Sequence, residues 1–153
     1  MNQAIAQASS SHFRLVLVVG PANSGKTRLL KEFHARKGWP LIALGKELSR
    51  RLLPLTVRQR ELKCAGIVAD IISEKDRDAD CLLVDNTDSV FDKSLKINVN
   101  GLLSSISRNK VLVWTWQGSI RDGAAVHGMR GHPEYCSLPT SDITVIEMAP
   151  TGE

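Results

Sequence analysis

The sequence has few cysteines and few aromatic residues, and it lacks a long apolar run. Its three cysteines, Cys64, Cys81 and Cys136, are far apart and form no CxxC pair, which argues against a disulfide framework or a zinc site. The longest unbroken aliphatic run covers residues 15–19, whereas a membrane-spanning helix needs about 20 apolar residues. We therefore expect free thiols and no transmembrane segment.

A secretory signal is also lacking, because residues 1–11 contain neither a basic cluster nor an apolar core. The balance of 20 Lys and Arg against 16 Asp and Glu gives a net charge of +4, which permits a nucleic-acid partner without requiring one. With 153 residues, 42 % of them apolar and 24 % charged, the chain is typical of one globular domain. We expect a cytoplasmic protein with a flexible lead-in over residues 1–12, a single domain over 13–149 and a tail over 150–153.

Short aliphatic segments alternate with helical patterns along the chain, which predicts an α/β fold with a parallel sheet and helices on both faces. Residues 118–142 hold four glycines, two prolines and two histidines, and we expect mostly loop there, with Asp122-Gly123 as a hairpin tip. The Thr56 and Gln59 pair has capping-box spacing for a helix start. The expected strands are 14–19, 41–44, 81–84, 110–116 and 143–148, and the other expected helices are 27–37, 46–53 and 95–107.

Residues 20–27, Gly-Pro-Ala-Asn-Ser-Gly-Lys-Thr, fit the pattern G-x-x-x-x-G-K-[ST] between an expected strand and an expected helix. Gly20 and Gly25 allow backbone amides to turn toward phosphate oxygens, and the helix N-terminus adds partial positive charge. Lys26 is expected at the β- and γ-phosphates and the Thr27 hydroxyl at Mg²⁺; the alternative is a chance turn before a helix. The expected nucleotide-binding residues are Gly20, Pro21, Ala22, Asn23, Ser24, Gly25, Lys26, Thr27 and Arg28.

A second acidic site follows the expected strand Cys-Leu-Leu-Val-Asp at 81–85. Asp85 would lie in the crevice at the carboxyl end of a parallel strand and hold Mg²⁺ together with Thr27; the alternative is an Asp that caps a turn. Many ATPases with this layout carry a Glu next, but here it is Asn86, whose amide can orient water without accepting its proton. Asp88 is either a substitute for that Glu or a turn cap. The sequence therefore predicts binding and leaves hydrolysis open.

The expected strand Val-Leu-Val-Trp-Thr-Trp-Gln at 111–117 carries a further candidate residue. If this strand lies between the strands that precede Gly20 and Asp85, Thr115 or Gln117 can reach the γ-phosphate or the water, a sensor-one role. The alternative is that Thr115 pairs locally within the core. Trp114 and Trp116 share one face, and we expect them to pack on a helix.

Several charged residues remain open to two interpretations. Arg121 or Arg130 is either an arginine finger for a neighbour's γ-phosphate or a solvated surface residue. His127 and His132 lack a third ligand nearby, which favours plain loop histidines over a metal site. The basic stretch from Lys46 to Lys63 either tracks a phosphate backbone or is a solvated helix face. It has no interleaved aromatic residues for stacking single-stranded bases.

Several of these segments together resemble BrxF, the family of small P-loop proteins of BREX phage-defence systems. The resemblance covers about residues 13–148. It implies a three-layer P-loop NTPase core similar to that of AAA-type ATPases, with a mainly parallel five-stranded sheet in the order 5-1-4-3-2 and no lid domain. The residues that carry the resemblance are 20–27, Leu83-Val84-Asp85-Asn86, Val90-Phe91-Asp92, Thr115-Trp116 before Gly118, and Gly131-His132-Pro133-Glu134-Tyr135.

The resemblance implies ATP and Mg²⁺ as ligands and a role as an ATP-binding, weakly hydrolysing subunit of a defence complex. Its binding residues carry over to Gly20, Gly25, Lys26, Thr27 and Asp85. A chain this short leaves little for a lid, so other subunits of the complex or a second copy would complete the site.

The catalytic set that we predict is Lys26, Asp85, Asn86 and Thr115. Two other functions stay open. One is a small nucleoside-kinase-like phosphotransferase, which would need clustered arginines. The other is a nucleotide-dependent DNA-binding adaptor that uses the stretch from Lys46 to Lys63. No guanine-reading N/T-K-x-D motif is present, which favours adenine by default.

Overall fold

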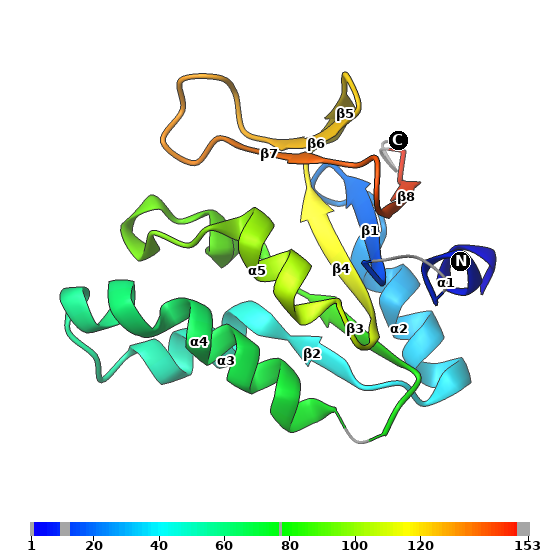
Figure 1. Cartoon of the computed structure of the whole chain (residues 1–153), viewed down its shortest axis with the longest axis horizontal. Coiled ribbons are helices and arrows are strands. Elements are labelled where there is room, and N and C mark those ends of the chain that lie inside the picture. Colours follow the sequence, from blue (N-terminus) through cyan, green and yellow to red (C-terminus); the bar gives the residue numbers. More distant parts are fainter. Residues whose placement is uncertain (1, 10–12, 77, 150–153) are drawn as a thin grey trace.

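Five parallel strands form the central sheet of the computed structural model, which describes residues 2–9, 13–76 and 78–149 (Figure 1). The strands follow one another in the order β2-β3-β4-β1-β8, and every neighbouring pair is parallel. The elements are α1 Asn2–Ser9, β1 Leu15–Gly20, α2 Lys26–Lys37, β2 Leu41–Ala43, α3 Leu44–Leu52, α4 Val57–Lys75, β3 Cys81–Asp85, the 3-10 turns η1 Asp88–Phe91 and η2 Lys93–Leu95, α5 Val99–Ile106, β4 Val111–Gln117, β5 Ser119–Arg121, β6 Ala124–His127, β7 Cys136–Pro139 and β8 Thr144–Glu147.

The strand order differs from the expected 5-1-4-3-2 in its numbering, because that order counted only five strands in the chain. Three further strands, β5, β6 and β7, form a separate antiparallel sheet, so the edge strand β8 is the eighth in chain order. By residues, the segment expected as the fifth strand lies at the edge beside β1. The strand β4 lies between β1 and β3, which brings the carboxyl ends of these three strands side by side.

Helices cover both faces of the central sheet because its strands are apolar on both sides. All six residues of β1 are buried. Leu15, Leu17 and Val19 pack into the core that α3, α4 and α5 share, whereas Val16 and Val18 pack into the core under α1 and α2. Figure 1 shows the two helical groups on opposite sides of the sheet.

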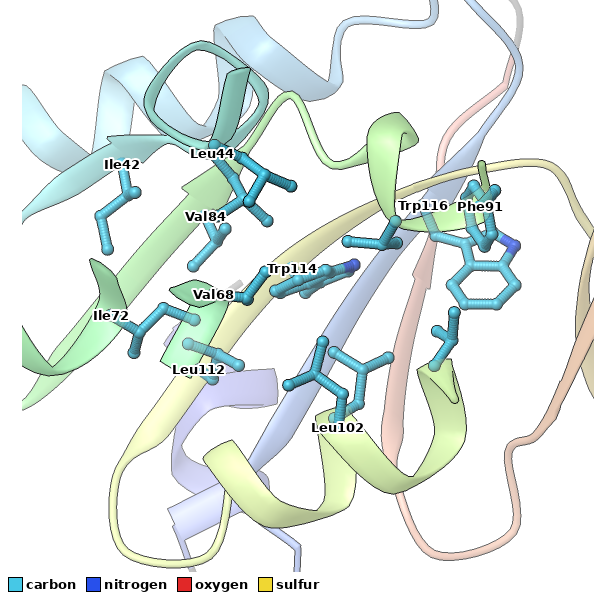
Figure 2. Packing of buried hydrophobic residues seen from close by; sticks show 14 of the residues in the cluster. Ile42, Leu44, Val68, Ile72, Val84, Phe91, Leu102, Leu112, Trp114 and Trp116 are labelled. Carbon is cyan, nitrogen blue, oxygen red and sulfur yellow. The ribbon is translucent and has the colours of Figure 1, made fainter. Parts of the chain in front are cut away.

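The largest side chains of the core come from β4. Trp114 and Trp116 are fully buried on the face under α3, α4 and α5, which confirms that they pack against helices. Figure 2 shows them in the same cluster as Val68 and Leu102. The Phe91 ring meets Trp116 edge to face, with ring centroids 4.9 Å apart. The last residue of η1 thus packs against β4.

The N-terminal segment is a helix, where the sequence predicted a flexible lead-in. Ala8 of α1 is fully buried, and Ala4 and Ile5 pack against the same core, next to β1 and β8. These three small or apolar residues share one helical face, so the helix forms by covering the sheet. Residues 10–12 of the expected lead-in and the expected tail, residues 150–153, lie outside the described residues.

Local capping signals confirm several predicted boundaries. The Thr56 and Gln59 capping box begins α4: the Gln59 N–H donates to Thr56 Oγ1 (3.2 Å) and the Thr56 N–H donates to Gln59 Oε1 (2.9 Å). Gly38, at φ 71°, ends α2. The helix expected from residue 95 begins later, at Val99, because Asn98 caps it through the Gly101 N–H (3.1 Å).

The second sheet occupies the segment that the sequence predicted as mostly loop. The Asp122-Gly123 hairpin tip is confirmed: both residues have positive φ, 50° and 75°, and they join β5 to β6. Figure 1 shows the β5–β7 sheet across the carboxyl end of β4. The Gly118 N–H donates to Gly20 O (3.1 Å), and a Cβ on Gly118 would lie 1.9 Å from Val126 O. The β5–β7 sheet therefore begins beside the 20–27 loop.

No helix in the described part of the chain is both long enough and apolar enough to cross a membrane. The longest, α4, has 19 residues. Its sequence carries charged side chains throughout, among them Arg58, Arg60, Lys63 and Asp70. The buried residues of α4 form a single stripe that faces the sheet, as in a surface helix of a globular fold.

Candidate functional site

The 20–27 loop joins the end of β1 to the start of α2. Two glycines are required in it. A Cβ on Gly20 would lie 2.5 Å from Ser24 Oγ and 3.0 Å from Met148 O, and Gly25 has φ 93°, in the left-handed region. Gly25 is the N-cap of α2 and makes no side-chain cap. The first N–H groups of a helix have no partner within the helix, so here they are open to an anion.

The ammonium group of Lys26 is folded back over this loop. Its Nζ donates to Pro21 O (2.6 Å), Gly20 O (2.9 Å) and Ser24 Oγ (3.3 Å). Burial lowers the pKa of Lys26, and the negative charges of Asp88 and then of Asp85 oppose that shift. The positive charge at the loop is therefore coupled to two carboxylates, Asp85 at the end of β3 and Asp88 at the start of η1.

The expected nucleotide-binding residues lie together at this edge. An open hollow of about 390 Å³ is lined by residues 23–28. Pro21, Ala22, Asn23, Thr27 and Arg28 are exposed, whereas the Ser24 side chain turns inward and is buried. The Thr27 hydroxyl at the start of α2 is thus accessible, while the Ser24 hydroxyl serves the loop itself as a partner of Lys26.

Asp85 lies where the sequence predicted, at the carboxyl end of β3 and half-buried. One strand, β4, separates it from the 20–27 loop, and its charge acts on Lys26. Among residues 2–9, 13–76 and 78–149, no three His, Cys, Asp or Glu side chains gather as a metal site. A cation between Thr27 and Asp85 would therefore draw most of its oxygen ligands from a bound nucleotide and from water.

Asn86, which the sequence placed in the catalytic set, makes its contacts toward α3. Its backbone is left-handed, at φ 56°, and its carbonyl oxygen accepts the Gly45 N–H (2.8 Å). The Asn86 side-chain amide lies 2.9 Å from where a Cβ on Gly45 would stand. Asn86 thus joins the end of β3 to α3, which is a structural role that the motif alone does not reveal.

Thr115 is buried in β4, and its hydroxyl lies 3.4 Å from that of Thr87. The Thr87 hydroxyl also donates to Thr115 O (2.5 Å). The Thr115 hydroxyl therefore has a partner within the core, and its sensor-one role stays a prediction. Thr87 is itself buried, with 1 % of its surface exposed, and sequence reasoning missed it. Its position after Asp85-Asn86 resembles an ordinary polar turn, so only the fold reveals its partner.

The candidate arginines and histidines lie on or near the second sheet. Arg121 in β5 and Arg130 in the loop after β6 are both exposed. His127 Nδ1 lies 2.6 Å from Gln117 O, and its ring stacks on Phe91 with centroids 3.8 Å apart. His132 accepts the Glu134 N–H through Nδ1 (3.1 Å). Both histidines thus have contacts within the fold.

Three arginines in the stretch from Lys46 to Lys63 are engaged by the protein itself. Arg50 pairs with Glu47 (2.7 Å) and Arg51 pairs with Glu74 (2.8 Å). Arg60 Nε donates to the carbonyl oxygens of Leu52 (3.0 Å), the last residue of α3, and of Leu55 (3.1 Å), just beyond that helix. These contacts favour the solvated helix face over a phosphate-tracking surface.

Comparisons with known proteins add nothing to this geometry. No family model, no curated protein and no solved structure matches the chain. The resemblance to the BrxF family therefore stays a prediction.

Proposed function

We propose that the chain binds Mg-ATP through the 20–27 loop and that its sheet is the core of a P-loop NTPase. One observation carries the proposal: the glycine-bounded loop holds the Lys26 ammonium at the uncapped start of α2. Backbone amides and a lysine that converge in this way form a cradle for phosphate oxygens. The strand order supports the same interpretation. Asp85 lies at the carboxyl end of β3, and β4 alone separates β3 from β1, the strand that leads into the loop.

The donors at the loop fit a nucleotide polyphosphate. The N–H groups of the first turn of α2 have no side-chain cap, and they lie at the positive end of the helix dipole. The three partners of Lys26 Nζ are neutral oxygens, which a phosphate anion would replace with a stronger charge-assisted bond. Phosphate binding would thus draw Lys26 away from Gly20 and Pro21.

The residues also fit Mg²⁺, because the exposed Thr27 hydroxyl and the Asp85 carboxylate are oxygen ligands at the same edge. Bound Mg²⁺ would neutralise charge on the β- and γ-phosphates. The protein's own part is to hold the phosphates on the loop amides and Lys26. Asp85 and Thr27 would hold the cation or the water molecules around it.

The proposed role is that of an ATP-binding subunit within a larger complex of the phage-defence type. The exposure of Pro21, Ala22, Asn23, Thr27 and Arg28 supports this, since much of the nucleotide would face outward. A second copy or another subunit could supply the missing contacts. The resemblance to BrxF supplies the defence context, and the open loop supplies the reason for a partner.

Calorimetric titration with Mg-ATP, Mg-ADP and Mg-GTP tests this proposal. The wild-type chain should bind Mg-ATP, and Lys26→Ala should weaken binding by about tenfold or more, because a charge-assisted bond to phosphate is lost. Lys63→Ala, which removes an exposed lysine on α4, is the matched control and should bind as the wild type does. Equal affinity in Lys26→Ala and wild type would refute the proposal.

A further inference from the structure

The segment after β3 is fixed at two points. The Gly45 N–H donates to Asn86 O (2.8 Å), and the Thr87 hydroxyl donates to Thr115 O (2.5 Å). The η1 turn that follows is anchored by Val90 and Phe91, both buried. The direction in which this segment presents its side chains is therefore set by neighbours on α3 and β4.

Within this segment, Asn86 contacts α3 through both its carbonyl oxygen and its side chain. Its side-chain amide lies against Gly45, and an amide cannot take a proton from water. Thr87 is buried and bonded to Thr115. Neither residue can act as a base at a bound nucleotide, which leaves the next position, Asp88.

Asp88 combines exposure with proximity to Lys26. It is the exposed first residue of η1. Its charge opposes the desolvation of Lys26 more strongly than the charge of Asp85 does. The Thr87 hydroxyl, one residue earlier, is bonded to Thr115 O of β4, the strand that lies between β3 and β1. Asp88 therefore follows directly on a contact with β4, at the edge of the sheet where β1 leads into the 20–27 loop.

We propose that Asp88, three residues beyond Asp85, faces the terminal phosphate of a bound nucleotide and is the base for ATP hydrolysis. The proposal rests on the proposed ATP site. A water oxygen would bond to the γ-phosphorus while the bond from that phosphorus to the β–γ bridging oxygen breaks. ADP and inorganic phosphate are the products, and the water proton passes to the Asp88 carboxylate. Asp88 would then return the proton to solvent, because its side chain is exposed.

Nucleotide affinity tests the placement of Asp88 separately from turnover. A carboxylate that faces the γ-phosphate repels it, so Asp88→Asn should raise the ratio of ATP to ADP affinity by at least about fourfold. Asp142→Asn is the matched control and should leave this ratio unchanged, because Asp142 is exposed and precedes the amino end of β8, whereas the 20–27 loop follows the carboxyl end of β1.

Single-turnover hydrolysis of labelled ATP, with protein in excess, tests the role of base. Asp88→Asn should slow the reaction by about 10²-fold or more, and the control Asp142→Asn should stay within about threefold of wild type. An unchanged affinity ratio in Asp88→Asn, or a rate equal to that of wild type, would overturn this proposal alone. A wild-type chain that bound neither ATP nor ADP would refute the proposed ATP site as well.

Discussion

The hydroxyl of Thr87 donates to the backbone oxygen of Thr115 and so ties the segment after β3 to the middle strand β4. Both residues are buried, so neither group has water as an alternative partner. This bond sets the position of the residues on either side of Thr87, which are Asn86 and Asp88. The proposed site therefore depends on a contact between two elements that are distant in sequence.

Replacement of Thr87 should show this dependence directly. Thr87→Val removes the donor and leaves a buried oxygen with one partner fewer, so the free energy of unfolding should fall by about 1–2 kcal/mol. Thr87→Ser keeps the hydroxyl and should lose less. Urea denaturation of the two variants measures the difference. A Thr87→Val variant as stable as the wild type would mean that this hydrogen bond contributes nothing to stability.

Two glycines should respond in opposite directions when replaced by alanine. Gly118→Ala places a Cβ 1.9 Å from Val126 O and should destabilise the chain by about 2 kcal/mol, because backbone must shift to relieve the clash. Gly66 is exposed in α4 with nothing within 4 Å of its Cβ position, so Gly66→Ala should stabilise by roughly 0.5–1 kcal/mol. Melting temperatures of both variants check the signs, and a stabilised Gly118→Ala would contradict the fold of the second sheet.

The basic stretch offers a pair of arginines for comparison. Arg60 donates to carbonyl oxygens of Leu52 and Leu55, so Arg60→Ala should lower the free energy of unfolding by about 1 kcal/mol. Arg58 is exposed on the same helix, and Arg58→Ala should leave stability unchanged. Guanidinium denaturation compares them. If the free energy of unfolding of Arg60→Ala equalled that of the wild type, the Arg60 side chain would not stabilise the fold and would be available to a partner instead.

The three cysteines should differ in reactivity. Burial raises the pKa of Cys64 to about 11 and that of Cys81 to about 12. It also raises the pKa of Cys136, which is half-buried. Only the thiolate form of a cysteine reacts. At about pH 8, roughly one Cys64 side chain in a thousand should be a thiolate, and the thiolate fraction of Cys81 should be still smaller. Labelling with iodoacetamide followed by mass mapping should therefore modify Cys136 first. Faster modification of Cys64 or Cys81 in the folded chain would contradict their burial.

Much of the central sheet could be predicted from the sequence, because its strands are apolar runs bounded by clear stops. Gly38 and the Thr56 and Gln59 pair marked helix ends with chemistry that acts within a few residues. Asp122-Gly123 marked its hairpin for the same reason. Such signals are local, so a single sequence contains them in full.

Other elements could not be predicted because they depend on distant partners. An isolated helix as short as α1 is marginal in water, and it forms here because Ala8 packs on the sheet. The strand β7 pairs with β6 across an intervening loop, and its residues show no strong alternation. In the candidate site, the orientation of Asn86 depends on Gly45, which lies in α3.

The most direct test of the proposed function is where the phosphates bind. Backbone amide NMR spectra of the labelled chain should be compared with and without Mg-ADP. The largest chemical-shift changes should fall on Gly25, Lys26 and Thr27, whose N–H groups would donate to phosphate oxygens. Saturating Mg-ADP that leaves these amides unmoved, or that shifts only residues outside the 20–27 loop, would contradict the proposed function.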